Sequence, residues 1–513
     1  MVDTGAATGT DTASDAAGGA LNGTSGRSGA LWWIALLALA LRVVEAVESS
    51  LWLDELHTLS HASQPTLGAV IESVQSEFHT PLFFAFVHLF GGFEAGAWLR
   101  VVPILSSVAL LWPLCTLARQ CGLSARATLA MAWLYACLPY QILYGSELRP
   151  YAWVLCFSVL AFALALSEQR SVLVRLAWFA LAILLGLLTH RLMALTLFSI
   201  GAARLFIRKP RAVPLWGLIL SGAIALAGFL PWLLGFAVQA TEARFEYQES
   251  VGGYHLRPTL VKELLALPAR VVAPFMGELG GNWKALEVVS CIAFAIAALA
   301  IAVLGWRNSK LRPPEPALRG LAIFAAVQFV ITTIFAVWTW DRVPLQYYTP
   351  MAWTIPVLLA AAWDRIEAAP ARRGLGVALA VSSLLMGIGL VGGRSREDMR
   401  AGIAAVRAMA EEARAVTGRE PIFTALLAQP PQFAHTLPYR AYAADLAALE
   451  PAAVPGPSDQ GFDRPVIVLR RAIGMGHEKW APITSGRAQI RSVSIDRYLT
   501  VYWFSPADSA LSR

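Results

Sequence analysis

Long runs of apolar residues, separated by short polar or charged segments, fill the chain from about residue 31 to about residue 392. A helix needs roughly 20 consecutive apolar residues to cross the hydrocarbon layer of a lipid bilayer, and about eleven runs approach that length. They lie near residues 31–48, 98–118, 127–144, 150–168, 174–189, 191–207, 214–238, 285–306, 319–339, 345–364 and 374–392. The pattern predicts an α-helical polytopic membrane protein with about 11 transmembrane helices.

A further apolar segment, residues 77–93, decides the predicted topology. If it does not cross the membrane, all the basic loops of the bundle fall on the side of the N-terminal tail. These loops are Arg119–Arg126, Arg170–Arg175, Arg204–Arg211, Arg307–Arg319 and Arg365–Arg373. Because basic loops are enriched in the cytoplasm, we expect 77–93 to be a re-entrant or juxtamembrane segment and the N-terminus to be cytoplasmic. Loops 49–97 and 239–284 and the C-terminus are then extracytoplasmic.

The two ends of the chain differ from this apolar middle, residues 30–393, which we interpret as a transmembrane module. Residues 1–29 are rich in Gly, Ala, Ser and Thr, a composition typical of a disordered tail. Residues 394–513 show a helical pattern at 396–416 and then four strand-like runs, EPIFTALL, RPVIVLRR, AQIRSVSI and RYLTVYWF. This order predicts a small C-terminal α/β soluble domain outside the cytoplasm.

Composition supports a membrane protein and narrows its partners. Of the 513 residues, 57% are hydrophobic and 15% are charged, against about 25% charged in a typical soluble domain. The net charge is +7, but the excess Lys and Arg lie in short loops between apolar runs. Membrane topology explains that excess, so we expect a lipid bilayer and no nucleic acid as partner. The five cysteines lie in or beside apolar runs, without metal-like or disulfide-like spacing.

Polar residues at the ends of the predicted spans are functional candidates, because polar groups near a bilayer cost free energy. Asp54 and Glu55 follow the first span, in SLWLDELH. They fit a general base beside a ligand of a metal or of a phosphate-bound metal, and they also fit an acidic pair that stabilises the N-terminus of a helix.

Histidines gather in the same region: four of the eight lie between residues 57 and 88. His79, in SEFHTPLFF, is suited to bind a metal or a phosphate. We interpret the other three, His57, His61 and His88, as ordinary histidines of a membrane interface.

Two short outer loops carry arginine, against the basic bias of the inner side. Arg149 lies in LYGSELRPYAW. Its planar fork suits phosphate, and it equally fits a snorkelling arginine paired with Glu147. His190 and Arg191 occupy a tight hairpin in LLTHRLMAL, which indicates either a second anion contact or a turn of residues that tolerate the interface.

A last polar cluster lies in WTWDRVPLQYYTP, whose aromatic residues are typical of a membrane interface. We interpret Asp341 and Arg342 as a pair, with Arg342 a weaker site candidate. All these clusters fall on one predicted face, which suits a site that holds a lipid phosphate as leaving group and deprotonates an incoming hydroxyl. The sequence has no Gly-rich loop for a nucleotide, which favours a lipid-linked donor.

Five stretches, in this order, resemble the polytopic glycosyltransferases of the protein O-mannosyltransferase and aminoarabinose-transferase type, which have the GT-C fold. They are WLDE after the first span, FHTPLFF, Arg100 with Pro103 at the start of the next span, SELRPYAW and THRL. No single stretch is specific, whereas the ordered set is. Thr80 replaces the first proline of the family's His-Pro-Pro-Leu segment, which loosens the backbone before Pro81.

The resemblance implies an inverting glycosyltransferase of the inner (plasma) membrane. It would transfer a hexosyl or pentosyl group from a polyprenyl-phosphate-linked sugar donor to an acceptor hydroxyl on a protein, glycolipid or glycan. By the same resemblance Asp54 is the base or the residue that positions the acceptor, and Glu55 is a lesser participant or a metal ligand. His79 and Arg149 correspond to the family's donor phosphate contacts. The resemblance implies no definite cofactor; since metal use varies within the family, a divalent metal ion held by Glu55 and His79 is compatible with it.

Neutralisation of the leaving phosphate requires positive charge, and this adds candidates to which the resemblance assigns no role. His190 and Arg191 are further donor phosphate-binding candidates. Glu147 and Arg342 are weaker site candidates without an assigned role. Two other functions compete with sugar transfer: a lipid or sugar transporter or flippase, and a non-catalytic receptor or scaffold. A transporter favours ionisable groups near the membrane midplane and internal repeats, whereas the polar clusters here lie at span ends.

Overall fold

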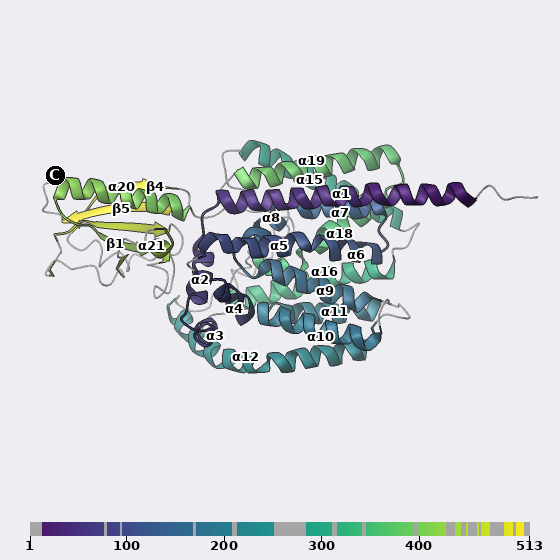
Figure 1. Ribbon diagram of the computed structural model, residues 1–513, viewed down its shortest axis with the longest axis horizontal. Helices are drawn as coiled ribbons and strands as arrows, with labels where there is room; N and C mark the ends of the chain where they lie inside the picture. Colours follow the sequence, from purple (N-terminus) through teal and green to yellow (C-terminus); the bar gives the residue numbers. More distant parts are fainter. Residues whose placement is uncertain are drawn as a thin grey trace, which may run out of the picture.

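The structure is a computed structural model, and it is mostly helical (Figure 1). It describes residues 13–75, 80–92, 95–167, 171–207, 213–250, 284–309, 315–340, 345–392, 398–426, 437–442, 448–449, 459–460, 463–471, 487–495 and 499–506. The helices before the C-terminal domain are α1 (Ala13–Glu48), α2 (Leu53–Ala62), α3 (Leu67–Gln75), α4 (Pro81–Leu89), η1 (Gly96–Arg100), α5 (Val101–Ala109), α6 (Leu111–Gln120), α7 (Ala125–Cys137), α8 (Pro139–Ser146), α9 (Tyr151–Leu166), α10 (Val172–Thr189), α11 (Met193–Phe206), α12 (Leu215–Ser250), α15 (Lys284–Ser309), α16 (Pro316–Trp340), η2 (Leu345–Tyr348), α17 (Thr349–Ala352), α18 (Thr354–Asp364) and α19 (Ala369–Gly392).

The long helices form one bundle. In the described part of the chain seven helices are long and apolar enough to cross a membrane, or eight if α8 and α9 count as one bent span. Two more, α11 and α18, are shorter apolar helices. The chain is therefore a multi-pass membrane protein, as the apolar runs predict. The predicted number of about 11 is not confirmed, because runs 127–144 and 345–364 are each broken into shorter helices.

The N-terminal end of α1 and the C-terminal domain lie at opposite ends of this bundle (Figure 1). We call the end beside the C-terminal domain, where α2, α3 and α4 lie, the domain end. The helix α4 has only nine residues, too few to cross a bilayer. Residues 80–92 therefore agree with the prediction of a re-entrant or juxtamembrane segment.

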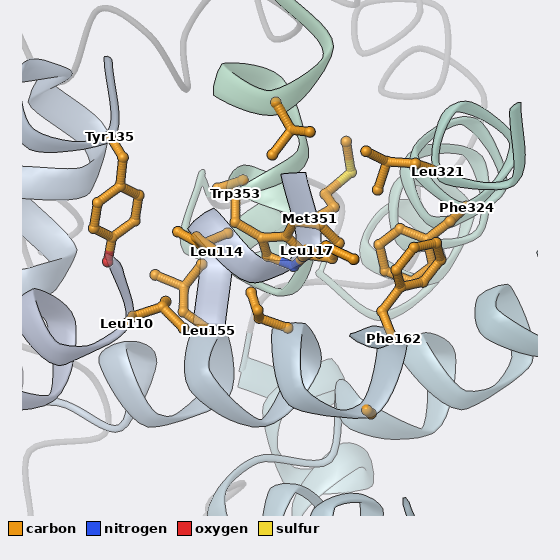
Figure 2. Packing of buried hydrophobic residues seen from close by; sticks show 14 of the residues in the cluster. Leu110, Leu114, Leu117, Tyr135, Leu155, Phe162, Leu321, Phe324, Met351 and Trp353 are labelled. Atoms are coloured by element: carbon orange, nitrogen blue, oxygen red, sulfur yellow. The ribbon is translucent and has the colours of Figure 1, made fainter. Parts of the chain in front are cut away.

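The core of the bundle is aromatic and aliphatic (Figure 2). Trp353 is fully buried, and its ring centroid lies 5.6 Å from those of both Phe162 and Phe324. Its indole Nε1–H donates to Ser158 Oγ and to the carbonyl of Pro350, at 3.0 and 2.8 Å. A large side chain can thus be buried without leaving its polar atom unsatisfied.

A buried arginine fixes α1 within the bundle. The guanidinium of Arg42 donates to Ser107 Oγ at 2.8 Å, and to the carbonyls of Ala136 and Tyr135 at 3.3 Å each. These bonds satisfy a charged side chain away from water and join α1 to α5 and α7. The part of α1 that leads towards α2 is therefore held in a defined place.

The corner between α8 and α9 brings charged residues to the domain end. The chain bends by 113° between the two helices, and Glu147, Leu148 and Arg149 form the corner. Proline disfavours helical geometry in the residue before it, so a helix is interrupted at Arg149, ahead of Pro150.

The C-terminal domain contains α20 (Met399–Thr417), α21 (Leu437–Tyr442), β1 (Ile422–Leu426), β2 (Ala448–Leu449), β3 (Val466–Arg471), β4 (Arg487–Ser494) and β5 (Leu499–Pro506). The sheet order is β2-β1-β3-β5-β4, with β1 parallel to β2 and β3, and β5 antiparallel to β3 and β4. The predicted α/β domain, its helix and its four strands are confirmed. Asp398 caps α20 through Ala401 N–H, and Gly418 ends it at φ +68°.

Two predicted boundaries differ from the structure. The helix α1 begins at Ala13, inside the segment 1–29 that was expected to be disordered, although its membrane-length apolar part begins only at Gly29. The segment 13–29 mixes alanines, which favour helix, with glycines, which disfavour it. Continuing an existing helix adds one hydrogen bond per residue, which lets α1 extend beyond its apolar part. The helix α12 likewise continues to Ser250, into the predicted outer loop 239–284; residues 251–283 lie outside the described residues.

Candidate functional site

The predicted site begins at the first turn of α2, which follows the connector 49–52 after α1. Asp54 and Glu55 lie in this turn, where the helix dipole stabilises negative charge. Glu55 also completes the cap of α2, because its Oε2 accepts the N–H of Trp52 at 3.2 Å. Neighbouring helical residues point about 100° apart, so the two carboxylates face different surroundings.

Glu55 faces the bundle and is completely buried. Its Oε1 accepts Arg100 Nε–H at 2.7 Å and the N–H of Leu148 at 2.6 Å, and its Oε2 pairs with Arg100 Nη2. Both carboxylate oxygens are therefore engaged by donors. This arrangement suits a carboxylate that holds α2, η1 and the α8–α9 corner together, rather than one that assists a base or binds a metal.

Arg100 is the partner that the sequence did not mark as a site residue. Besides Glu55, it donates to the carbonyls of Ala46, Ser49 and Ser50 at 2.7, 2.8 and 2.9 Å. Those carbonyls end α1 and begin the connector. Two sequence signals pointed to it: a charge at the head of an apolar span, and a place in the family resemblance that carried no assigned role.

Asp54 faces the open side of α2 and keeps about a third of its side chain exposed, 32%. Its Oδ2 lies 3.8 Å from Nη2 of Arg149, whose side chain is only 4% exposed. Arg149 Nη1 donates to the carbonyl of Asp54 and to Thr58 Oγ1, each at 3.0 Å. Asp54 is thus held beside a fixed cation and still reaches solvent.

Burial alone lowers the pKa of Arg149, but Tyr151 and Asp54 outweigh burial and the net pKa is raised. The Tyr151 ring centroid lies 5.8 Å from the guanidinium carbon, close enough for a cation–π contact. Glu147 is buried in the same corner and contributes to the raised pKa of Arg149. Its backbone carbonyl accepts Arg149 N–H at 2.7 Å, which turns the corner.

His190 and Arg191, between α10 and α11, complete the described part of the cluster. Burial, Arg191 and Arg149 lower the pKa of His190 to about 3, so its imidazole is neutral near pH 7. Its Nδ1 accepts the N–H of Leu192 at 3.2 Å, which assigns the ring proton to Nε2. Its ring centroid lies 6.2 Å from that of Tyr151.

Arg191 supplies positive charge on this side. Its pKa is lowered by burial, and the hydroxyl of Tyr347 in η2 is its hydrogen-bond partner. A guanidinium stays protonated at neutral pH despite that shift. The charge of the cluster therefore comes from Arg149 and Arg191, while His190 offers only a neutral N–H donor.

Other predicted residues fall outside the cluster or outside the described residues. His79 and Arg342 lie outside the described residues. Among the residues that are described, no three His, Cys, Asp or Glu side chains are close enough together to hold a metal ion. His61 Nδ1 lies 3.2 Å from Ser73 Oγ, and His88 Nδ1–H donates to the carbonyl of Ala62 at 2.8 Å. These contacts join α2, α3 and α4.

Comparison with known proteins identifies the fold. No protein-family model matches the sequence, and no curated protein matches it. The apo crystal structure of ArnT from Cupriavidus metallidurans matches over 92% of this chain and 97% of its own, with a TM-score of 0.54 and 16% identity. The same protein bound to undecaprenyl phosphate matches over 94% and 99%, with a TM-score of 0.53 and 14% identity. The chain therefore has the GT-C fold that the resemblance implied.

Proposed function

We propose that the protein is a membrane glycosyltransferase that transfers a sugar from a polyprenyl-phosphate-linked donor to an acceptor hydroxyl, with inversion. The observation that carries the proposal is the pairing of half-open Asp54 with buried Arg149, beside Arg191. One carboxylate that reaches solvent and two guanidinium groups supply the base and the phosphate contacts that such a transfer needs. The bound undecaprenyl phosphate of the ArnT structure supports a polyprenyl phosphate as the lipid partner.

In this reaction Asp54 accepts the proton of the acceptor hydroxyl as its oxygen attacks the anomeric carbon. The bond from that carbon to the phosphate oxygen breaks on the opposite face, which inverts the configuration, and the lipid phosphate leaves. Arg149 and Arg191 neutralise the charge that develops on the phosphate. His190 donates from Nε2–H as a neutral group, because its pKa lies far below neutral pH. His79 remains a predicted phosphate contact, and Arg342 remains a weaker site candidate.

A metal ion at Glu55 does not fit the described contacts. Both oxygens of Glu55 already accept hydrogen bonds from Arg100 and from backbone N–H groups. A cation there would have to displace the buried guanidinium of Arg100. We therefore assign Glu55 a positioning role.

We place the protein in the inner membrane of the cell, with the domain end on the extracytoplasmic side. The N-terminal end of α1 lies at the opposite end of the bundle (Figure 1). The positive-inside bias of the predicted basic loops assigns the side of the N-terminal tail to the cytoplasm. The acceptor is then a protein, glycolipid or glycan of the cell envelope. A transporter is less well supported, since the described cluster lies at one end of the bundle.

The proposal is tested with the full chain reconstituted in liposomes and supplied with polyprenyl-phosphate-linked sugars and extracted envelope acceptors. We expect the mass of the acceptor to rise by that of one sugar and the lipid phosphate to be released. Asp54→Asn should abolish transfer, whereas Glu48→Gln, which removes an exposed acid at the end of α1, should not. Full transfer by Asp54→Asn would contradict the role of Asp54.

A further inference from the structure

The connector 49–52, which leads from α1 into α2, is held from two sides. On the bundle side, Arg100 donates to the carbonyls of Ser49 and Ser50, and also to Ser49 Oγ at 3.1 Å. Within the connector, Trp52 N–H bonds to Glu55. These bonds fix one side of the connector and leave two of its polar groups, the N–H of Leu51 and Oγ of Ser50, for another partner.

The C-terminal domain supplies that partner. The N–H of Leu51 donates to the phenolic oxygen of Tyr442 at 2.6 Å, across 391 residues of sequence. Met399 N–H, at the start of α20, donates to Ser50 Oγ at 2.9 Å. An N–H at the first turn of a helix has no partner within that helix, so Ser50 also completes the beginning of α20.

Apolar contacts join the same two parts. The helix α21, which carries Tyr442, packs against α2, and both lie where the bundle meets the C-terminal domain (Figure 1). One continuous buried cluster contains Leu51, Leu53, Leu56 and Leu59 beside Met399, Ile403, Tyr439 and Trp503. The apolar side of α2 is therefore part of the core of the C-terminal domain, while Asp54 and Thr58 face Arg149.

We propose that the C-terminal domain is a clamp on α2, and that Tyr442 is a positioning residue that sets the place of Asp54 and Arg149. The clamp is close to the site, because Asp54 lies only two residues after the connector. The Asp54 carbonyl and Thr58 Oγ1 in turn accept hydrogen bonds from Arg149. The catalytic part of this inference rests on the proposed sugar transfer, but the mechanical part does not. A displacement of about 1 Å at such a site is enough to lower a rate on the order of a hundredfold.

Two tyrosines of α21 provide a matched test. Tyr442→Phe removes the hydroxyl that accepts Leu51 N–H, whereas Tyr439→Phe removes a hydroxyl that donates to the Thr424 carbonyl inside the domain, at 3.0 Å. Each variant loses one oxygen from the same helix. The full chain in lipid nanodiscs is measured by hydrogen exchange, without any substrate.

We expect Tyr442→Phe to raise exchange in residues 49–62 about fivefold and to leave β1 unchanged, since one hydrogen bond stabilises by about 1 kcal/mol, which is about fivefold. Tyr439→Phe should affect β1 and spare residues 49–62. Exchange in 49–62 within twofold of the wild type in Tyr442→Phe would overturn the clamp. Should that variant not fold, Ser50→Ala, which removes the acceptor for Met399 N–H, carries the same expectation for residues 49–62.

Sugar transfer tests the positioning role separately. Counted per polyprenyl-phosphate binding site, kcat of Tyr442→Phe should fall about tenfold while KM for the donor changes less than about threefold. Tyr439→Phe should retain kcat. An unchanged kcat despite faster exchange would overturn the positioning role. If the wild type transfers no sugar, the proposed function fails, and hydrogen exchange still decides whether the clamp exists.

Discussion

Asp54 and Glu55 are neighbours in sequence, yet each pairs with a different arginine in a different environment. Glu55 is completely buried, and Arg100 and two backbone N–H groups occupy both of its oxygens. Asp54 keeps 32% of its side chain exposed and lies 3.8 Å from Arg149. The buried pair resembles a structural joint, whereas the open pair has room for a substrate. Two neighbouring residues of one helical turn can therefore have different roles: Glu55 holds structural elements together, and Asp54 is open to a substrate.

The largest effect is expected from breaking the buried pair. Arg100→Met leaves Glu55 buried without its guanidinium, and removing one partner of a buried ion pair costs about 3–5 kcal/mol. The melting temperature of the purified protein in detergent should fall sharply, together with the folded yield. Adding Glu55→Gln to Arg100→Met should recover part of the loss, because no buried charge is then left unpaired. If Arg100→Met alone melts like the wild type, the buried pair does not stabilise the fold more than the open pair does.

The open pair should respond differently, in function before stability. Arg149→Lys keeps the charge but loses the planar guanidinium whose Nη1 donates to both the Asp54 carbonyl and Thr58 Oγ1. Charge-assisted hydrogen bonds contribute about 1.5–3 kcal/mol, so kcat/KM for the donor should fall on the order of tenfold to a hundredfold. Steady-state transfer and the affinity for undecaprenyl phosphate measure this. Retained kcat/KM with a large loss of stability would instead make Arg149 another structural joint.

A smaller, pH-dependent effect is expected from His190. It tests whether this side chain is neutral, so that the positive charge beside the open pair comes from arginine alone. Its folded pKa is lowered to about 3 from 6.5, so the neutral form stabilises the fold above pH 6.5. That contribution is lost as pH falls from 6.5 towards 3, by about 2 kcal/mol at pH 5. His190→Gln should be less sensitive to acid than the wild type in thermal unfolding at pH 7 and pH 5. Equal acid sensitivity in both would mean that His190 is not buried as a neutral group.

Much of this arrangement was predictable from span ends. Apolar runs indicated the membrane bundle, and positive-inside reasoning placed Asp54, Arg149, His190 and Arg191 on one face. The structure brings these four residues into one cluster. The C-terminal helix and strands followed from periodicity, because each buries one face. These features depend on local sequence or on a simple count of crossings.

The remaining features depend on contacts between distant segments. That Glu55 faces Arg100 follows from the rotation of α2 against η1, which no local pattern encodes. The neutral state of His190 depends on burial beside two arginines from different loops. The helix α21 is only six residues long, and its hydrogen bond to Leu51 in the connector spans 391 residues. Tertiary packing decides all three.

The most direct test of the account compares Asp54→Asn with Glu55→Gln in parallel preparations, each measured for transfer per folded molecule and for melting temperature. We predict that Asp54→Asn melts like the wild type and loses transfer by a factor of about a hundred or more, since general base catalysis contributes about 10²–10⁴. Glu55→Gln should lose stability first and keep measurable transfer in the molecules that fold. The reverse result, an inactive but stable Glu55→Gln beside an active Asp54→Asn, would contradict the account.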